Sequence, residues 1–299
     1  TAWTNIGANS PSLTVANAEE ALRVRVVISY VDSEGFAESI TTSPVTISPR
    51  SSITGILDKV GLIQGSVSQG GRTDDLTPTI TGTLSVGLAA GEGLRVFNGS
   101  ALLGTASVDH VARTWSLTPN LPSSSGTSYS FTARVVDASG NLGAASAART
   151  MILDTTAPVS TAAIAAVGDN AGFLTGAVSH AGLTDDRTPA ITGTLSAPLA
   201  AGETLRVFNR DALLGSATVN NAARTWSFTP TLPSASGESY SISVRVADSA
   251  GNLGPSSPAR NFVLDSTPPA TTVSITGVSD NVGLLQGTVT SAGRTDDLT

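Results

Sequence analysis

The chain of 299 residues contains no cysteine, and its only histidines are His110 and His180. Without thiols, neither a disulfide framework nor a thiolate metal site or cysteine nucleophile can form. Two histidines by themselves do not make a zinc site. Charged residues make up 13% of the chain, where about a quarter is usual. Stability must therefore come from packing or from another kind of cross-link.

The sequence also lacks a basic cluster and a long apolar run. The formal net charge is −7 and the arginines are scattered, so we do not expect nucleic acid as a partner. No apolar run reaches the ~18 residues that a membrane helix needs, and the start at Thr1 does not resemble a signal peptide. We expect both ends to be cuts within a longer chain, with targeting and anchoring signals outside it.

The chain contains an internal repeat. Its composition is rich in Ser, Thr, Ala, Gly and Val, which favours strands and turns. The segment "TDDLTPTITGTLS" begins at position 73 and "TDDRTPAITGTLS" at 184, which is 184 − 73 = 111 positions later, and "TDDLT" returns at 295. Each copy has about the size of an independent domain. We predict two full repeats at 49–157 and 158–268, the C-terminal part of a divergent domain at 1–48, and the start of a third repeat at 269–299.

Period-2 and turn signals in the second full repeat predict seven short strands, at about 159–166, 188–196, 204–209, 213–219, 225–230, 239–247 and 259–265. Seven such strands are typical of a two-sheet, immunoglobulin-like β-sandwich. The expected inward residues are Leu205, Val207, Trp226, Phe228, Ile242, Val244 and Val246. The predicted fold class is therefore all-β, with tandem seven-stranded sandwiches.

The segments outside the full repeats predict how the domains are connected. The leading piece reads as a short strand with Trp3 followed by two long strands around a polar turn. The links "LDTTAP" (153–158) and "LDSTPP" (264–269) contain proline, which fixes φ and removes a donor. Short, stiff links favour an elongated rod over loosely tethered domains.

The order of antiparallel strands also predicts which loops meet between the two full repeats. The end of the first sandwich should carry the loop after its first strand together with the end of its last strand, and it should face a turn of the second sandwich. This gathers the five carboxylates of Asp58, Asp74, Asp75, Asp154 and Asp248, with Asn252 beside them. Repulsion between them would be relieved by a cation, and calcium accepts such oxygen ligands in flexible geometry.

The same set recurs at the other junctions. The following junction would use Asp169, Asp185, Asp186 and Asp265, and the preceding one Asp137 with Asn141. An alternative stays open for each element: "DASGN" and "DSAGN" are good hairpin turns by residue type, and the TDD segments could be Asx turns or solvated. No EF-hand loop or glycine-rich nonapeptide repeat supports calcium.

A combination of short motifs points to a family. The patterns "TDD.TP.ITGTLS", "AAGE.LRVFN", "RTWS.TP.LP..SG.SY", "RV.D..GNLG" and "LD.T.P" resemble the bacterial immunoglobulin-like repeats of giant surface adhesins exported by type I secretion. The resemblance covers residues 55–299. The leading segment resembles another bacterial Ig-like repeat of large calcium-associated surface proteins, of which only the C-terminal part is present.

The resemblance implies an extender region that holds a distal adhesive tip away from the cell, supports adhesion and biofilm formation, and is stiffened by calcium at its junctions. Its partners would be adjacent repeats of the same chain and a host or surface ligand bound by a domain outside this chain. The implied location is extracellular, on the bacterial surface or secreted. One departure is Lys59, which stands where the later copies have Asn170 and Asn281 and would compete with a cation.

Three other functions are alternatives to an extender region. An enzyme needs a nucleophile and base or a paired acid and base in a pocket, but neither histidine recurs, since His110 aligns with Asn221 and His180 with Gln69. We therefore expect no catalysis. A carbohydrate-binding module is a closer rival, although aromatic residues are only 4% of the chain and mostly fall on inward positions. A self-associating matrix fibre is the third alternative.

Overall fold

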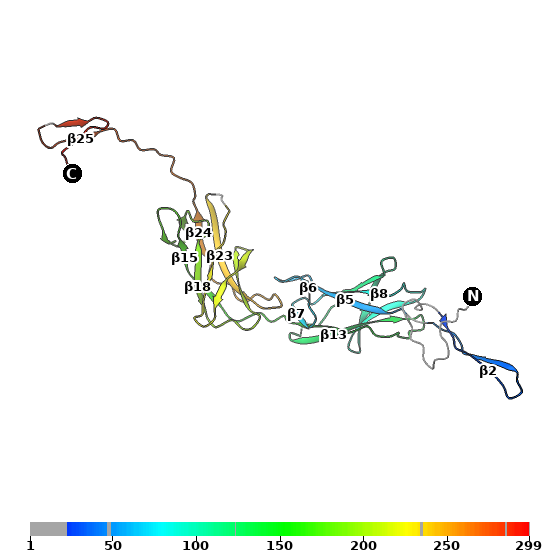
Figure 1. Ribbon diagram of the computed structural model, residues 1–299. Helices are drawn as coiled ribbons and strands as arrows, with labels where there is room; N and C mark the ends of the chain where they lie inside the picture. Colours follow the sequence, from blue (N-terminus) through cyan, green and yellow to red (C-terminus); the bar gives the residue numbers. More distant parts are fainter. Residues whose placement is uncertain (1–22, 47–48, 123, 234–235, 285, 299) are drawn as a thin grey trace.

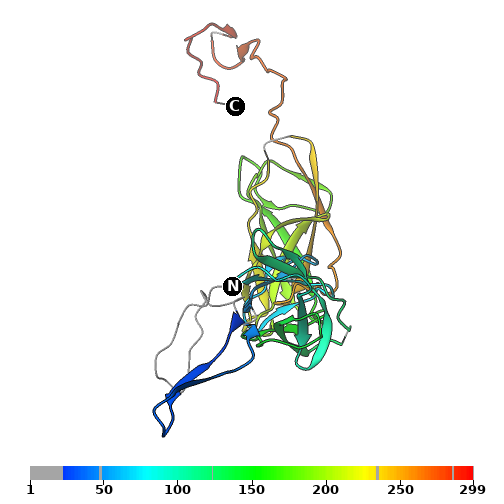
Figure 2. The same cartoon turned by 90° about the vertical axis from the view of Figure 1, so that its right-hand side faces the viewer.

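The computed structural model describes residues 23–46, 49–122, 124–233, 236–284 and 286–298. All regular structure in these ranges is β-strand, as predicted. The described chain contains no helix long and apolar enough to cross a membrane. Two β-sandwiches follow each other end to end with their long axes inclined, and the terminal pieces project at opposite ends (Figures 1 and 2).

The first sandwich consists of two five-stranded sheets, ordered β11-β12-β8-β5-β6 and β10-β9-β13-β14-β7. The first sheet contains β5 (Ser51–Asp58), β6 (Gly65–Ser66), β8 (Thr79–Leu84), β11 (Ser107–Asp109) and β12 (Thr114–Leu117). The second contains β7 (Gly71–Thr73), β9 (Gly93–Asn98), β10 (Ala101–Thr105), β13 (Thr127–Val136) and β14 (Arg149–Leu153).

The second sandwich has the same topology, with sheets ordered β16-β15-β18-β22-β21 and β17-β24-β23-β19-β20. Its first sheet contains β15 (Ala162–Asp169), β16 (Gly176–Ala177), β18 (Ala190–Leu195), β21 (Thr218–Asn220) and β22 (Thr225–Phe228). Its second contains β17 (Gly182–Thr184), β19 (Thr204–Asn209), β20 (Ala212–Ser216), β23 (Glu238–Ala247) and β24 (Arg260–Leu264).

The structure differs from the expected seven strands at three places, one of which is the short strand β16 that pairs with the end of β15. The segment 213–219 divides into β20, which pairs with β19, and β21, which pairs with β22 in the opposite sheet. A strand that crosses between sheets must bend, and the crossing lies at Ala217, between the end of β20 and the start of β21. The segment before the second TDD forms β17, which pairs in parallel with β24, where a loop was expected.

Each core is built on the inward face that the alternation predicts. Along β23 the buried residues alternate with half-exposed ones, and Leu205, Val207 and Trp226 are also buried. The indole of Trp226 packs directly on the backbone of Gly193, where a Cβ atom would collide with the ring and with the carbonyl of Ala163. Glycine is thus required at this position so that the ring can approach the sheet.

The two end pieces form short hairpins. In the leading piece β1 (Arg23–Val24) pairs with β4 (Val45–Thr46), and β2 (Val27–Val31) pairs with β3 (Ala37–Thr41). The expected strand with Trp3 lies outside the described residues. In the last piece β25 (Val278–Asp280) pairs with β26 (Gly287–Val289).

Candidate functional site at the junction of the two sandwiches

The end of the first sandwich is organised by the parallel pair β7–β14. Their register puts Thr73 opposite Leu153, and the N–H of Asp154 donates to the carbonyl of Thr73 at 2.8 Å. The TDD segment and the end of the last strand therefore lie side by side. Asp58, at the end of β5, joins them because the Thr73 hydroxyl donates to its carboxylate at 2.5 Å.

Two of these acids are acceptors within their own loop. The buried Asp75 accepts the N–H of Lys59 at 3.0 Å and both the N–H and the hydroxyl of Thr77, at 2.7 and 3.1 Å. Asp58 also accepts the N–H of Val60 at 3.0 Å. Buried carboxylates with several such donors are satisfied without a metal ion. The Asx-turn alternative accounts for these two acids.

The second sandwich repeats this arrangement at its far end. Asp186 accepts the N–H of Asn170 and of Thr188, at 3.1 and 2.7 Å, and Asp169 accepts the Thr184 hydroxyl at 2.7 Å. The loop thus has the same hydrogen bonds in both repeats, although only the first repeat has another full sandwich against it. The repeated acidic segment is, in the first place, a means of closing each sandwich.

Asp74 differs from these acids in one of its carboxylate oxygens. Its side chain lies directly against Gly61, and its Oδ1 is buried with no hydrogen-bond partner among the described residues. Burial, followed by the charges of Asp58, Asp248 and Asp75, raises the pKa of Asp74 from 3.8 to about 6. Asp248 belongs to the second sandwich, so part of this repulsion arises at the junction itself.

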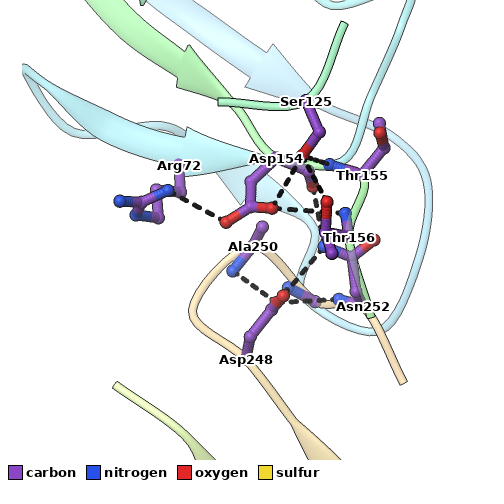
Figure 3. A network of polar contacts seen from close by, with 9 residues as sticks. Arg72, Ser125, Asp154, Thr155, Thr156, Asp248, Ala250 and Asn252 are labelled. Atoms are coloured by element: carbon purple, nitrogen blue, oxygen red, sulfur yellow. Dashed lines mark hydrogen bonds and ion pairs between the residues drawn. The ribbon is translucent and has the colours of Figure 1, made fainter. Parts of the chain in front are cut away.

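Asp154 already has a cationic partner. Its carboxylate forms an ion pair with Arg72 at 2.9 Å and accepts hydrogen bonds from the Ser125 hydroxyl and the Thr156 N–H, both at 3.2 Å (Figure 3). In the second repeat Asp265 accepts equivalent bonds from Ser236 and Thr267. Leu183 stands there in the place of Arg72, so the two strand ends differ in charge.

The second sandwich contributes the turn from Asp248 to Asn252. Asp248 accepts the N–H groups of Ala250 and Asn252 at 2.9 and 3.0 Å, and the Asn252 amide at 2.9 Å. The same amide donates across the junction to the main-chain carbonyl of Asp154 at 2.7 Å (Figure 3). This bond joins the two sandwiches directly.

Close contacts between the two sandwiches lie next to this hydrogen bond. A Cβ atom at Gly251 would lie 3.0 Å from the backbone nitrogen of Ile63, in the loop between β5 and β6. Ala250 is only 1% exposed, whereas the aligned Ser139 of the first repeat is exposed. Since the two turns have the same hydrogen-bonding pattern, the junction itself accounts for the burial of Ala250.

The corresponding turn of the first repeat, from Asp137 to Asn141, shows the same turn without a neighbouring sandwich against it. The Asn141 amide donates to Asp137 at 2.9 Å, and the N–H of Asn141 donates to the same carboxylate at 2.8 Å. These bonds lower the pKa of Asp137. Asn141 is exposed, so this turn has the internal hydrogen bonds of its counterpart but is not covered by any of the described residues.

The predicted ligands are therefore distributed over three places. Asp58, Asp74, Asp75, Asp154 and Asp248 gather at the junction, Asp169, Asp185, Asp186 and Asp265 at the far end of the second sandwich, and Asp137 on an open turn. Within the described ranges, no three acidic or histidine side chains are arranged to hold a metal ion. Asp74 is the member of the set that has a buried oxygen without a hydrogen-bond partner.

Sequence reasoning missed two contributions to this site. The hydroxyl of Thr73, which donates to Asp58, could have been found because a threonine precedes both aspartates in every copy. The apolar pair Leu62–Ile63, which contacts the turn, was also overlooked. Its signal was the recurrence of two large apolar residues after a glycine, as Phe173–Leu174 and Leu284–Leu285, at the same offset.

Comparison with known families gives one direct match. Residues 161–266, which contain most of the second repeat, match the family of bacterial Ig-like domains. No curated protein matches the chain significantly.

Several solved structures resemble the chain at low identity. The fibronectin(III)-like modules of Clostridium thermocellum CbhA give a TM-score of 0.38 at 16% identity, over 66% of this chain and 90% of that one. A 1.5-MDa bacterial ice-binding adhesin gives 0.31 at 18%, over 83% and 76%. A Ca²⁺-stabilized adhesin with which an Antarctic bacterium binds ice gives 0.33 at 18%, over 80% and 56%.

Proposed function

We propose, from the match of residues 161–266 to the family of bacterial Ig-like domains, that the chain is an extender segment of a bacterial surface adhesin. Its repeats would hold a distal adhesive domain, outside this chain, away from the cell. The proposed location is the cell surface or the extracellular space, and the proposed role is mechanical, without catalysis. Adhesion and biofilm formation would depend on the reach of the segment.

The observation that carries the proposal is the direct contact between consecutive repeats. Asn252 donates to the carbonyl of Asp154 across the junction, and Ala250 is buried there. A hydrogen bond and a buried turn at the joint restrict bending, which a segment that sets distance requires. If a flexible linker alone joined the two sandwiches, the orientation of one would not be fixed relative to the other.

Calcium at the junction is the second part of the proposal, favoured by one observation. The carboxylate of Asp74 is partly buried, has an unpaired oxygen and is repelled by the charges of Asp58 and Asp248. A divalent cation there would balance these charges, with Asp248 and main-chain carbonyls as further ligands. Asp154 is less suited to that role, because Arg72 already neutralises it.

Small-angle scattering tests both parts separately. The chain is measured in millimolar calcium and then in excess chelator, with thermal unfolding alongside. We expect one defined, extended interdomain arrangement in calcium, and a shorter particle with a lower midpoint in chelator. A flexible pair of bodies in both conditions would overturn the extender proposal. An interdomain arrangement that is fixed and does not change in chelator would contradict the role of calcium. Packing between the sandwiches would then account for the stiffness.

The remaining alternatives give different results. A matrix fibre would show self-association that rises with concentration, and a carbohydrate-binding module would bind on a glycan array. Either result would replace the extender function.

A further inference from the structure

The far end of the second sandwich presents an apolar surface made of Phe173, Leu174 and Leu183. Their side chains are 98%, 81% and 65% exposed. The first two lie in the loop between β15 and β16, and Leu183 lies in β17. In the first repeat the aligned Ile63 and Arg72 line one common pocket together with Ser249 of the next sandwich. The three residues are therefore expected to surround the equivalent place, which we call the apolar tip.

We infer that the apolar tip is a docking surface for the Asp-Xaa-Xaa-Gly-Asn turn of a following repeat. This rests on the proposed function, since it requires repeats in series. At the observed junction that turn is placed against Leu62 and Ile63, and there Leu62 is half-buried and Ile63 is 39% exposed. Large apolar side chains as exposed as Phe173 and Leu174 commonly mark an interaction surface.

The tip already has the shape that receives the turn. Asp185 lies against Gly172 as Asp74 lies against Gly61. The N–H of Asp265 donates to the carbonyl of Thr184 at 2.8 Å, as that of Asp154 does to Thr73. The second strand end is thus fixed in the same way before any repeat covers it. A preformed surface binds without the entropic cost of ordering a loop.

Two residues of the Asp248–Asn252 turn explain why such a turn can pack closely against the end of the preceding sandwich. At Gly251 the φ angle is +102° and a Cβ atom would press on the backbone of Ile63. Glycine at this position allows the two backbones to approach. The asparagine that follows supplies the amide for the strand-end carbonyl. Because the tip has leucine in place of Arg72, its junction would lack an ion pair and depend more on apolar contact, so it should respond less to salt.

The test completes the third repeat on the existing chain. Thr299 aligns with Thr188, so residues 189–268 are appended after Thr299, which adds a second copy of the turn. The chain has no cysteine of its own, so introduced pairs report cleanly in oxidative cross-linking. The reference pair is Ile63→Cys with Ser249→Cys, the test pair is Leu174→Cys with the appended copy of Ser249→Cys, and the control pair is Ile63→Cys with Ala138→Cys.

We expect the test pair to cross-link within about tenfold of the reference rate, and the control pair to remain reduced. Changing Phe173 and Leu174 to serine should reduce cross-linking of Leu183→Cys with the same appended cysteine at least tenfold. Because both side chains are almost fully exposed, this change should leave the second sandwich folded, which its thermal midpoint checks.

A test pair that stays reduced while the reference pair cross-links would overturn the docking proposal and leave the extender function intact. Failure of the reference pair would instead count against the proposed function itself. Intermolecular Leu174→Cys dimers of the unextended chain, rising with concentration, would identify the tip as a self-association surface and also overturn the proposal.

Discussion

The side-chain amide of Asn252 donates a 2.7 Å hydrogen bond to the main-chain carbonyl of Asp154, 98 positions earlier in the chain. The acceptor belongs to the backbone, so it persists whatever side chain occupies position 154. The donor also holds its own turn through Asp248. One residue thus shapes the turn and attaches it to the preceding sandwich.

Asn252→Ala should loosen the junction while both sandwiches stay folded. The change removes one hydrogen bond across the junction, worth about 1 kcal/mol, together with the bond inside the turn. Asn141→Ala is the matched control, because it removes the same bond inside the turn of the first repeat and no interdomain bond. Small-angle scattering should show a broader range of interdomain arrangements for the first variant only. Equal scattering from the two variants would mean that the bond does not restrain the joint.

Arg72→Leu gives the first strand end the residue that the second repeat has at this position. The ion pair with Asp154 is lost, but Arg72 is 43% exposed, so we expect less than about 1 kcal/mol of destabilisation. The freed carboxylate should bind calcium more tightly, which isothermal titration measures. Unchanged calcium binding would exclude Asp154 as a ligand. Arg206→Leu, in β19 of the second sandwich, removes the same charge and is the control for net charge.

Asp74→Asn should change how stability depends on pH. The folded pKa, about 6, lies above the ordinary 3.8, so the folded chain binds a proton more readily than the unfolded chain between about pH 4 and 6. The contribution of this group is therefore most favourable at the acidic side and declines as pH rises through about 6. Asparagine removes this decline.

At pH 7.5 the variant should be more stable than the parent by up to about 1 kcal/mol, since solvent screens much of the effect. Thermal unfolding from pH 4 to 7.5 measures this difference. Asp185→Asn, at the position aligned with Asp74, should leave the pH dependence due to Asp74 in place. A parent and an Asp74→Asn variant with parallel pH profiles would contradict the assignment.

Asp75→Ala should destabilise the first sandwich by about 2–4 kcal/mol, because it removes a buried carboxylate that accepts three hydrogen bonds from Lys59 and Thr77. The second sandwich should be unaffected. Asp186→Ala should destabilise the second sandwich by a similar amount and leave the first unaffected. Calorimetry that resolves two transitions checks this, and the loss should persist in chelator if the acid acts within its loop. A loss seen only in calcium would identify Asp75 as a ligand instead.

Sequence reasoning anticipated the fold more fully than the site. Alternation along residues such as Ile242, Val244 and Val246 specified which face is buried, since a strand exposes successive side chains on opposite sides. The sheet crossing near Ala217 and the parallel strand β17 were not anticipated. Short segments of this kind pair through their backbones, so their side chains carry little signal.

The sequence by itself determined the all-β class, the 111-residue spacing and, through the order of antiparallel strands, the ends on which the acids lie. Only the tertiary structure decided what each acid does. Asp75 accepts donors from its own loop, Asp154 pairs with Arg72, and Asp74 is left with an unpaired oxygen. These three have the same carboxylate, and the difference between them comes from burial and from the donors within hydrogen-bonding distance, which depend on how distant segments pack.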